Sequence, residues 1–170
     1  FVPPAAVLGA AIEAIESGCK LVVATADEMP VADAIEVRAA ARAGGAVFVG
    51  PNTPGLISPG KAKMGFMPSF CYMQGNVGVI SRSGSLSYEG SKRITQAGIG
   101  QTTVVGIGGD PVKGTTAAEA LGRFHADADT KAVLYLGEIG GSEETFVAEY
   151  ASRKDAKPVA ALIVGKTAPP

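Results

Sequence analysis

Short runs of β-branched and other apolar residues alternate along this chain with longer amphipathic segments, and Gly, Pro or Asp stands at each change. The short runs are typical of strands buried in a sheet, and the longer segments carry apolar residues at helical spacing. Such alternation favours an α/β fold built around a parallel sheet. The sequence predicts strands at residues 20–25, 46–49, 77–80, 102–107, 132–136 and 159–164, and helices at residues 5–17, 31–42, 85–97, 115–125 and 143–152.

Prolines and glycines crowd residues 50–75, which leaves little room for a helix in that segment. We expect a loop there with room for one edge strand, and we place a domain boundary within it. The predicted division is a first unit at residues 1–68, a linker at residues 69–75 and a second unit of at least four strands at residues 76–170.

The composition excludes several classes of protein. Apolar residues make up 46% of the 170 residues and charged ones 18%, which is enough apolar surface to bury a core and rules out a disordered chain. The 15 basic and 16 acidic residues are well mixed, so we expect neither a nucleic acid nor a membrane surface as a partner. Cys19, Cys71 and the single His125 are too few for a zinc site, and we expect no metal.

A serine-rich turn follows the strand expected at residues 77–80. In a parallel sheet, ligands bind at the carboxyl ends of the strands, where helix N-termini present free N–H groups and the positive end of the helix dipole. Ser83, Gly84 and Ser85 stand at such a point, and their amides and hydroxyls could bind a phosphoryl group or an oxyanion. The alternative is an ordinary helix start with Ser85 as its N-cap.

Two further strand ends are candidates for ligand binding. The glycine-rich loop at residues 106–115 matches neither a Walker motif nor G-x-G-x-x-G, so it is weak evidence for direct ligand contact. Glu138 follows a predicted strand and lies among glycines, so its carboxylate could orient a histidine or act as a base. The alternative is that Glu138 pairs with a nearby Arg or Lys. His125 lies at the end of an expected helix, away from these loops, and is a poor catalytic candidate.

Five motifs taken together in their order are more specific than any one of them. They are Gly50-Pro51-Asn52-Thr53-Pro54-Gly55, Ser81-Arg82-Ser83-Gly84-Ser85-Leu86-Ser87-Tyr88-Glu89, Gly106-Ile107-Gly108-Gly109-Asp110-Pro111, Gly137-Glu138-Ile139-Gly140-Gly141 and Thr167-Ala168-Pro169-Pro170. Over essentially the whole chain, these motifs resemble the succinyl-CoA synthetase α subunit family. The resemblance implies part of a CoA-binding Rossmann domain at residues 1–68, followed by a flavodoxin-like parallel-sheet ligase domain at residues 76–170.

The resemblance also implies a reaction. In this family a nucleoside triphosphate phosphorylates a histidine, the phosphoryl group passes to a carboxylate substrate, and CoA displaces phosphate to form the acyl-CoA. The chain would thus belong to a succinate–CoA ligase of the nucleoside-diphosphate-forming kind, an enzyme of the tricarboxylic acid cycle. Malate or citrate as the acyl substrate stays open, because residues 26–30 and 68–72 depart from the usual succinyl-CoA synthetase pattern.

Two other functions remain as alternatives. A CoA-binding module without catalysis would share the same motifs. A nicotinamide-binding Rossmann protein is disfavoured, because no G-x-G-x-x-G follows a first strand with an acidic residue about 20 positions further on.

By motif position, the resemblance implies roles for particular residues. Ser83, Gly84 and Ser85 would face the phosphoryl group, and Glu138 would hydrogen-bond the phosphohistidine ring. Tyr88 would lie beside the carboxylate substrate. Contacts with CoA are implied for Thr25, Ala26 and Asp27, and for the passage lined by Asn52, Thr53 and Pro54.

The family supplies further expectations about ligands, partners and the ends of the chain. CoA would be a substrate, and ATP or GTP with Mg²⁺ would bind a β subunit in an αβ or α2β2 assembly that acts on a small dicarboxylate. The family's phosphorylated histidine lies beyond Thr-Ala-Pro-Pro, and its glycine-rich CoA loop lies before Phe1, so we expect a fragment that lacks both termini and is inactive alone. The compartment would be the cytoplasm of a bacterium or archaeon, or the mitochondrial matrix of a eukaryote.

Overall fold

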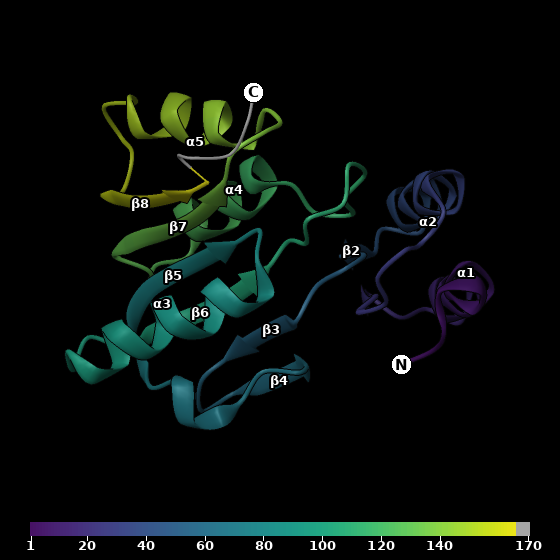
Figure 1. The fold of residues 1–170 in the computed structure, drawn as a ribbon, viewed down its shortest axis with the longest axis horizontal. Helices are drawn as coiled ribbons and strands as arrows, with labels where there is room; N and C mark the ends of the chain where they lie inside the picture. Colours follow the sequence, from purple (N-terminus) through teal and green to yellow (C-terminus); the bar gives the residue numbers. More distant parts are fainter. Residues whose placement is uncertain (166–170) are drawn as a thin grey trace.

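The computed structural model describes residues 1–165 and has the predicted mixture of helices and parallel strands (Figure 1). The helices are α1 (Val7–Glu16), α2 (Val31–Ala43), α3 (Gly84–Gln96), α4 (Ala117–Ala126) and α5 (Glu143–Ala151), with short 3-10 helices η1 (Pro4–Ala6) and η2 (Ser69–Cys71). The strands are β1 (Leu21–Val23), β2 (Val47–Val49), β3 (Gly55–Ser58), β4 (Ala62–Gly65), β5 (Gln74–Ser81), β6 (Gln101–Gly106), β7 (Ala132–Glu138) and β8 (Val159–Val164). In the described part of the chain, no helix has the length and apolar character needed to cross a membrane.

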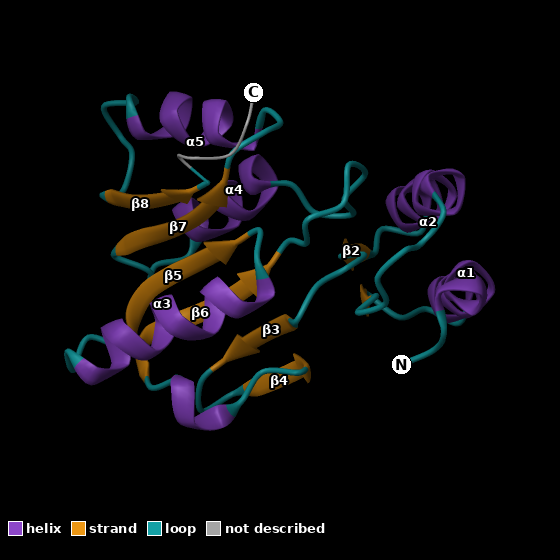
Figure 2. Cartoon of the chain, viewed as in Figure 1, coloured by secondary structure: helices purple, strands orange, loops and turns teal. Residues whose placement is uncertain are grey.

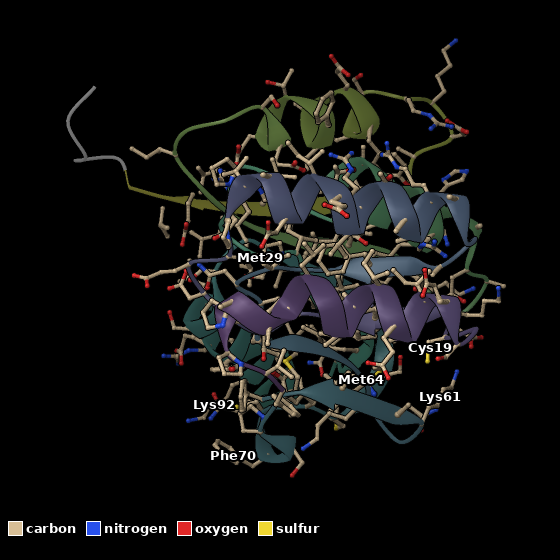
Figure 3. The ribbon with its side chains drawn as sticks, turned by 90° about the vertical axis from the view of Figure 1, so that its right-hand side faces the viewer. Cys19, Met29, Lys61, Met64, Phe70 and Lys92 are labelled. Atoms are coloured by element: carbon tan, nitrogen blue, oxygen red, sulfur yellow. The ribbon has the colours of Figure 1, made fainter. Side chains whose placement is uncertain are left out.

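The first part of the chain forms a two-stranded parallel sheet, β1 with β2, beside two helices. α1 and α2 lie side by side, as the end-on and lengthwise views both show (Figures 1 and 3). Their apolar faces pack with the strands into one core, in which Val37 is fully buried. At the end of β2, Gly50 has a φ of 99°, and a Cβ at this position would lie 2.3 Å from the carbonyl oxygen of Ala24. Only glycine fits the place where the chain leaves β2 against the end of β1.

The second sheet has six strands in the order β4-β3-β6-β5-β7-β8. β5, β6, β7 and β8 are parallel, and numbered along the chain their order is 2-1-3-4, the beginning of the flavodoxin-like order. The predicted α/β class, with a flavodoxin-like second sheet, is therefore confirmed.

Residues 55–65, where one edge strand was expected, instead contain two. β3 and β4 form an antiparallel hairpin, and β3 also pairs antiparallel with β6, with Leu56 opposite Val105. The two flanking prolines, Pro54 and Pro59, stand just outside β3, where they interrupt no strand hydrogen bond. The hairpin therefore extends the second sheet, although it precedes the linker predicted at residues 69–75; the domain boundary itself stays a prediction.

Helices cover both faces of the second sheet, α3 on one side and α4 and α5 on the other (Figure 2). Successive strand residues therefore enter different cores: Val79 packs in the core beneath α3, and Ile80 packs beneath α4 and α5. Both residues are fully buried. A strand buried on both faces reads as a continuous apolar run, which is why these strands could be recognised in the sequence.

Candidate functional site

The strand order creates a topological switch point between β5 and β7. From β5 the chain passes to β6 on one side, and it later enters β7 on the other side of β5. Ser81 lies opposite Gly106 of β6 and Leu136 of β7, so the carboxyl ends of the three strands are level. The helices that follow β5 and β7 start here, which makes this edge the expected ligand position in an open parallel sheet.

Ser83, Gly84 and Ser85 form the start of α3 at this edge. Ser83, and not Ser85, is the N-cap, with extended backbone angles (φ −97°, ψ 136°), and its side chain makes no capping hydrogen bond. The hydroxyl oxygens of Ser83 and Ser85 lie 3.4 Å apart. The first turn of α3 thus lacks the usual side-chain acceptor for its N–H groups, which suits it to bind an external anion.

Glu138 is the last residue of β7 and lies on the other side of the switch point. The guanidinium of Arg82 donates to the backbone carbonyl of Glu138 at 2.6 Å, but among residues 1–165 the Glu138 carboxylate has no ion-pair partner. The alternative that Glu138 pairs with a basic side chain is therefore wrong for these residues. Its half-buried carboxylate remains available at the sheet edge.

Arg82 itself forms the ion pair with Glu144, at 3.1 Å. Glu144 lies in the first turn of α5 and also accepts a hydrogen bond from the Tyr135 hydroxyl at 2.9 Å. Burial alone would raise the pKa of Glu144, but hydrogen bonds from its own backbone N–H, from Tyr135 and from Arg82 hold that pKa below its ordinary value. The sequence did not single out this network, although Arg82 carries the same signal as Glu138, a charged residue directly after a buried strand.

Tyr88 lies in the second turn of α3 and is half-buried. Its hydroxyl donates to the carbonyl of Phe66, 2.9 Å away, in the segment that follows β4. Burial, with a smaller effect from Cys71, raises the pKa of the Tyr88 hydroxyl, so it stays a neutral hydrogen-bond donor at neutral pH. The contact joins the start of α3 to the edge hairpin.

Asn52, Thr53 and Pro54 form a loop that connects the two sheets. The Asn52 side chain donates to the carboxylate of Asp110 at 3.0 Å, and the buried Thr53 hydroxyl donates to the carbonyl of Gly106 at the end of β6. The Pro54 ring packs against both Gly106 and Gly84 at the start of α3. The structure therefore brings this predicted segment next to Ser83–Ser85.

Thr25, Ala26 and Asp27 follow β1 and lie at the far end of that loop. The Ala26 carbonyl accepts a hydrogen bond from the Asn52 N–H at 2.8 Å. Thr25 and Ala26 line a cavity of ≈ 160 Å³, whereas Asp27 is exposed. The two predicted CoA-contact segments are thus adjacent, but the contacts of the described residues connect only the second one to the switch point.

The glycine-rich loop between β6 and α4 makes contacts within the protein. Its Gly114 N–H donates to the carbonyl of Gly50 at 2.8 Å, and the Thr115 hydroxyl donates to the carbonyl of Phe48 at 2.6 Å. Lys113 is 7% exposed and donates to the carbonyl of Asp110 at 2.7 Å. Burial lowers the pKa of Lys113 against the opposing effect of Glu143. This loop joins the second sheet to the end of β2.

His125 lies in the last turn of α4, with Nδ1 3.1 Å from the Tyr150 hydroxyl. Within residues 1–165 no group of three or more His, Cys, Asp or Glu side chains is placed to hold a metal ion. The predicted motif Thr167-Ala168-Pro169-Pro170 lies outside the described residues.

The comparisons with known proteins agree on a family of CoA ligases. The model of a CoA-ligase family matches residues 80–170. The chain is 46% identical over 170 residues to the succinate–CoA ligase (ADP-forming) subunit alpha 1 of Archaeoglobus fulgidus and 45% identical over 172 residues to the corresponding alpha subunit of Aquifex aeolicus. These alignments cover 100% of this chain but 58% and 56% of the two relatives, so the chain spans little more than half of their length.

A solved structure has the same fold. ATP citrate lyase from Methanothrix soehngenii, in complex with citrate and coenzyme A, superposes with a TM-score of 0.88 at 25% identity. The superposition covers 98% of this chain and 29% of that one. Residues of both sheets thus share their arrangement with a CoA-bound protein.

Proposed function

The chain belongs to the CoA-ligase family, and from this premise we propose that it is part of the α subunit of a nucleoside-diphosphate-forming succinate–CoA ligase. The observation that carries the proposal is the switch point itself. There the uncapped N-terminus of α3 and the Glu138 carboxylate, which has no ion-pair partner within residues 1–165, flank the carboxyl ends of β5 and β7. This pairing supplies N–H donors for a phosphoryl group and an acceptor for an imidazole N–H at one edge.

In the proposed reaction, ATP or GTP phosphorylates a histidine, succinate takes the phosphoryl group as an acyl phosphate, and CoA displaces phosphate. Ser83, Gly84 and Ser85 hold the phosphoryl group through N–H groups and hydroxyls, which stabilise its negative charge as it moves. Glu138 accepts a hydrogen bond from the phosphohistidine ring and so fixes its tautomer and orientation. We place that histidine beyond Pro170, and Mg²⁺ with the nucleotide on the β subunit.

CoA in this proposal lies along the contact between the two sheets. Thr25, Ala26 and Asp27 hold part of the molecule at the end of β1. The Asn52–Pro54 loop fits the thiol end, because its Pro54 ring touches the start of α3 while its backbone N–H at Asn52 reaches Ala26. The thiol thus enters from the first sheet toward the acyl phosphate at the second.

Tyr88 is the proposed neighbour of the dicarboxylate. Its neutral hydroxyl can donate to a carboxylate once it leaves the Phe66 carbonyl, and its position one turn into α3 is close to the phosphoryl site. The β subunit, in an αβ or α2β2 assembly, covers this surface.

Citrate is the second candidate for the acyl substrate. The observation in its favour is the superposition on ATP citrate lyase with citrate and coenzyme A, at a TM-score of 0.88. Malate, whose size lies between succinate and citrate, is included in the same test.

The test uses the complete native chain assembled with its β subunit. Succinate, malate and citrate are each offered with CoA and ATP or GTP, and the acyl-CoA product is identified by mass spectrometry. We expect succinyl-CoA, a loss of turnover in Tyr88→Ala, and an intermediate rate in Tyr88→Phe, which keeps the ring. Citryl-CoA as the main product would replace succinate by citrate, and CoA binding without any acyl-CoA would indicate a non-catalytic module.

A further inference from the structure

Arg82 crosses the switch point from one strand to the other. It follows β5 directly, and its backbone N–H donates to the carbonyl of Leu136 in β7 at 3.0 Å. Its side chain continues in the same direction, and only 10% of it is exposed. A guanidinium so deeply buried requires close partners, because burial of an unpaired charge is costly.

The partners of Arg82 converge on one nitrogen atom. Nη1 donates to the carbonyls of Glu138 and Gly140, each at 2.6 Å, and to Oε1 of Glu144 at 3.1 Å. Nε is buried and has no hydrogen-bond partner among the described residues. The buried Nε–H is thus unsatisfied, while three acceptor groups share the single nitrogen Nη1. This arrangement differs from the usual pairing of arginine, in which two parallel N–H groups bind one carboxylate, and it places the charge at the loop.

The loop between β7 and α5, whose carbonyls accept hydrogen bonds from Arg82, has little rigidity of its own. Gly140 and Gly141 both have positive φ, 90° and 93°. Glycines in such conformations give a loop many alternatives, so its shape must be fixed by contacts. Arg82 contacts the loop on both sides of Ile139, through the carbonyls of Glu138 and Gly140, and Glu144 anchors the guanidinium from the first turn of α5.

We infer that Arg82 is a positioning residue: it fixes the loop between β7 and α5, and with it the carboxylate of Glu138, relative to the N-terminus of α3. The inference rests on the proposed function, in which these two groups act on the same phosphohistidine. In this inference Arg82 acts through the contacts of its Nη1 with the loop carbonyls and with Glu144. Its effect on phosphoryl transfer passes through Glu138.

A purely structural ion pair and a positioning residue predict different results. Loss of a structural pair lowers stability and affects every step alike. Loss of a positioning residue slows the step that needs Glu138, whereas CoA binding, which in the proposal depends on residues 25–27 and 52–54, stays unchanged. Lysine should rescue a positioning role here, because its ammonium presents three donors at one point.

The experiment uses the complete native chain assembled with its β subunit. The variants are Arg82→Ala, Arg82→Lys and the matched control Arg93→Ala, which removes an exposed arginine of α3 paired with Glu89. Histidine phosphorylation by ATP is followed by rapid quench, CoA affinity by calorimetry and folding by the thermal midpoint. We expect phosphorylation to slow by about 10- to 100-fold in Arg82→Ala and to recover to within about threefold of wild type in Arg82→Lys, because small misplacements of reacting groups have effects of this size. Arg93→Ala should match wild type, and CoA affinity should be unchanged in all variants.

The possible results distinguish failure of the proposed function from failure of the inference about Arg82. A wild-type complex that binds CoA but forms no phosphohistidine would overturn the proposed function and the inference together. A phosphorylated wild type with Arg82→Ala at the same rate would overturn the inference alone, as would an Arg82→Lys variant that is as slow as Arg82→Ala. If Arg82→Ala does not fold, Glu144→Gln decides: it keeps the side-chain shape and removes the anchoring charge, so slower phosphorylation with unchanged CoA affinity supports the inference, and a wild-type rate contradicts it.

Discussion

Glu144 shows at the residue scale how the site's ion pair is linked to pH. Its pKa in the folded protein lies below the ordinary value of about 4.3. A carboxyl group with a lowered folded pKa stabilises the fold above the unfolded pKa, and that contribution is lost as the pH falls through the folded pKa. We therefore expect the free energy of unfolding of wild type to fall between about pH 5 and pH 3 more steeply than that of Glu144→Gln.

Urea unfolding at a series of pH values measures this difference in slope. Glu149→Gln is the matched control, because Glu149 is an exposed carboxylate on the same helix. It should retain the wild-type slope. A Glu144→Gln variant with the wild-type slope would show that the Arg82 and Tyr135 contacts do not lower the pKa of Glu144.

Two glycines give opposite predictions for the same substitution. Gly50 has a φ of 99° and no room for a Cβ beside the Ala24 carbonyl, so Gly50→Ala should lower the free energy of unfolding by about 1–3 kcal/mol. Gly9 lies inside α1, where a Cβ would meet no atom within 4 Å, so Gly9→Ala should raise it by about 0.5–1 kcal/mol. Chemical denaturation of the two variants measures both. Equal effects of the two substitutions would contradict the backbone geometry at Gly50.

The sequence identified some of these residues and missed others for a physical reason. Ser83–Ser85 and Glu138 were predicted because they follow buried strands, and the structure places both at the switch point. Arg82 and Glu144 were missed as a pair because they are 62 residues apart, and their contact depends on β5 lying beside β7. Strand order is a tertiary property that the local pattern of residues does not contain.

At the scale of elements, α4 has the best-formed helix start in the described chain. The Thr116 hydroxyl accepts from the Glu119 N–H at 3.2 Å, and the Glu119 carboxylate accepts from the Thr116 N–H at 2.8 Å, which is a capping box. Thr116→Ala should lower the free energy of unfolding by about 1 kcal/mol. Ser142→Ala is the matched control at α5, where the N-cap side chain makes no such bond, and should change it by no more than a few tenths.

Urea unfolding of Thr116→Ala and Ser142→Ala measures both changes in the free energy of unfolding. An equal loss in both variants would mean that the cap hydroxyl of Thr116 contributes nothing specific. The comparison also bears on the site, because α3, like α5, begins without a side-chain cap. In the first turn of α5 the Glu144 carboxylate accepts a hydrogen bond from its own backbone N–H, whereas no side chain caps the first turn of α3, the helix start assigned to the phosphoryl group in the proposed function.

The edge hairpin is the element that the sequence predicted least well. Proline and glycine around residues 55–65 favoured a loop with one edge strand, but β3 and β4 pair with each other and β3 also pairs with β6. Short strands with alternating burial give a weak signal, and their pairing with a distant strand supplies what their own sequence lacks. The longer strands of the second sheet were predicted within a few residues because their apolar runs are continuous.

For the whole molecule, the structure shows how two separate sheets meet at one edge. The Asn52–Pro54 loop touches the end of β6 and the start of α3, and Gly114 donates to Gly50 at the end of β2. These contacts place the carboxyl ends of both sheets together. The α/β class and the positions of most elements could be predicted from the sequence, but this meeting of the two units could not, because it depends on tertiary contacts between distant loops.

Met64, Phe66, Phe70 and Met73 are exposed apolar side chains in or near the hairpin. Phe66 is 62% exposed and Phe70 is 76% exposed, and Phe70 projects from the edge of the molecule (Figure 3). The carbonyl of Phe66 accepts a hydrogen bond from the Tyr88 hydroxyl, so Phe66 adjoins the proposed substrate position. Exposed apolar side chains of this extent make the isolated chain prone to association.

In the proposed function, this chain presents a phosphohistidine site at the switch point between β5 and β7. The most direct measurement incubates the complete native chain and its β subunit with ATP and maps any phosphoryl group by mass spectrometry under alkaline conditions, which preserve phosphohistidine. We predict one phosphorylated histidine beyond Pro170, discharged when succinate and CoA are added together. A chain that takes up no phosphoryl group, or one that carries it on His125, would contradict the account.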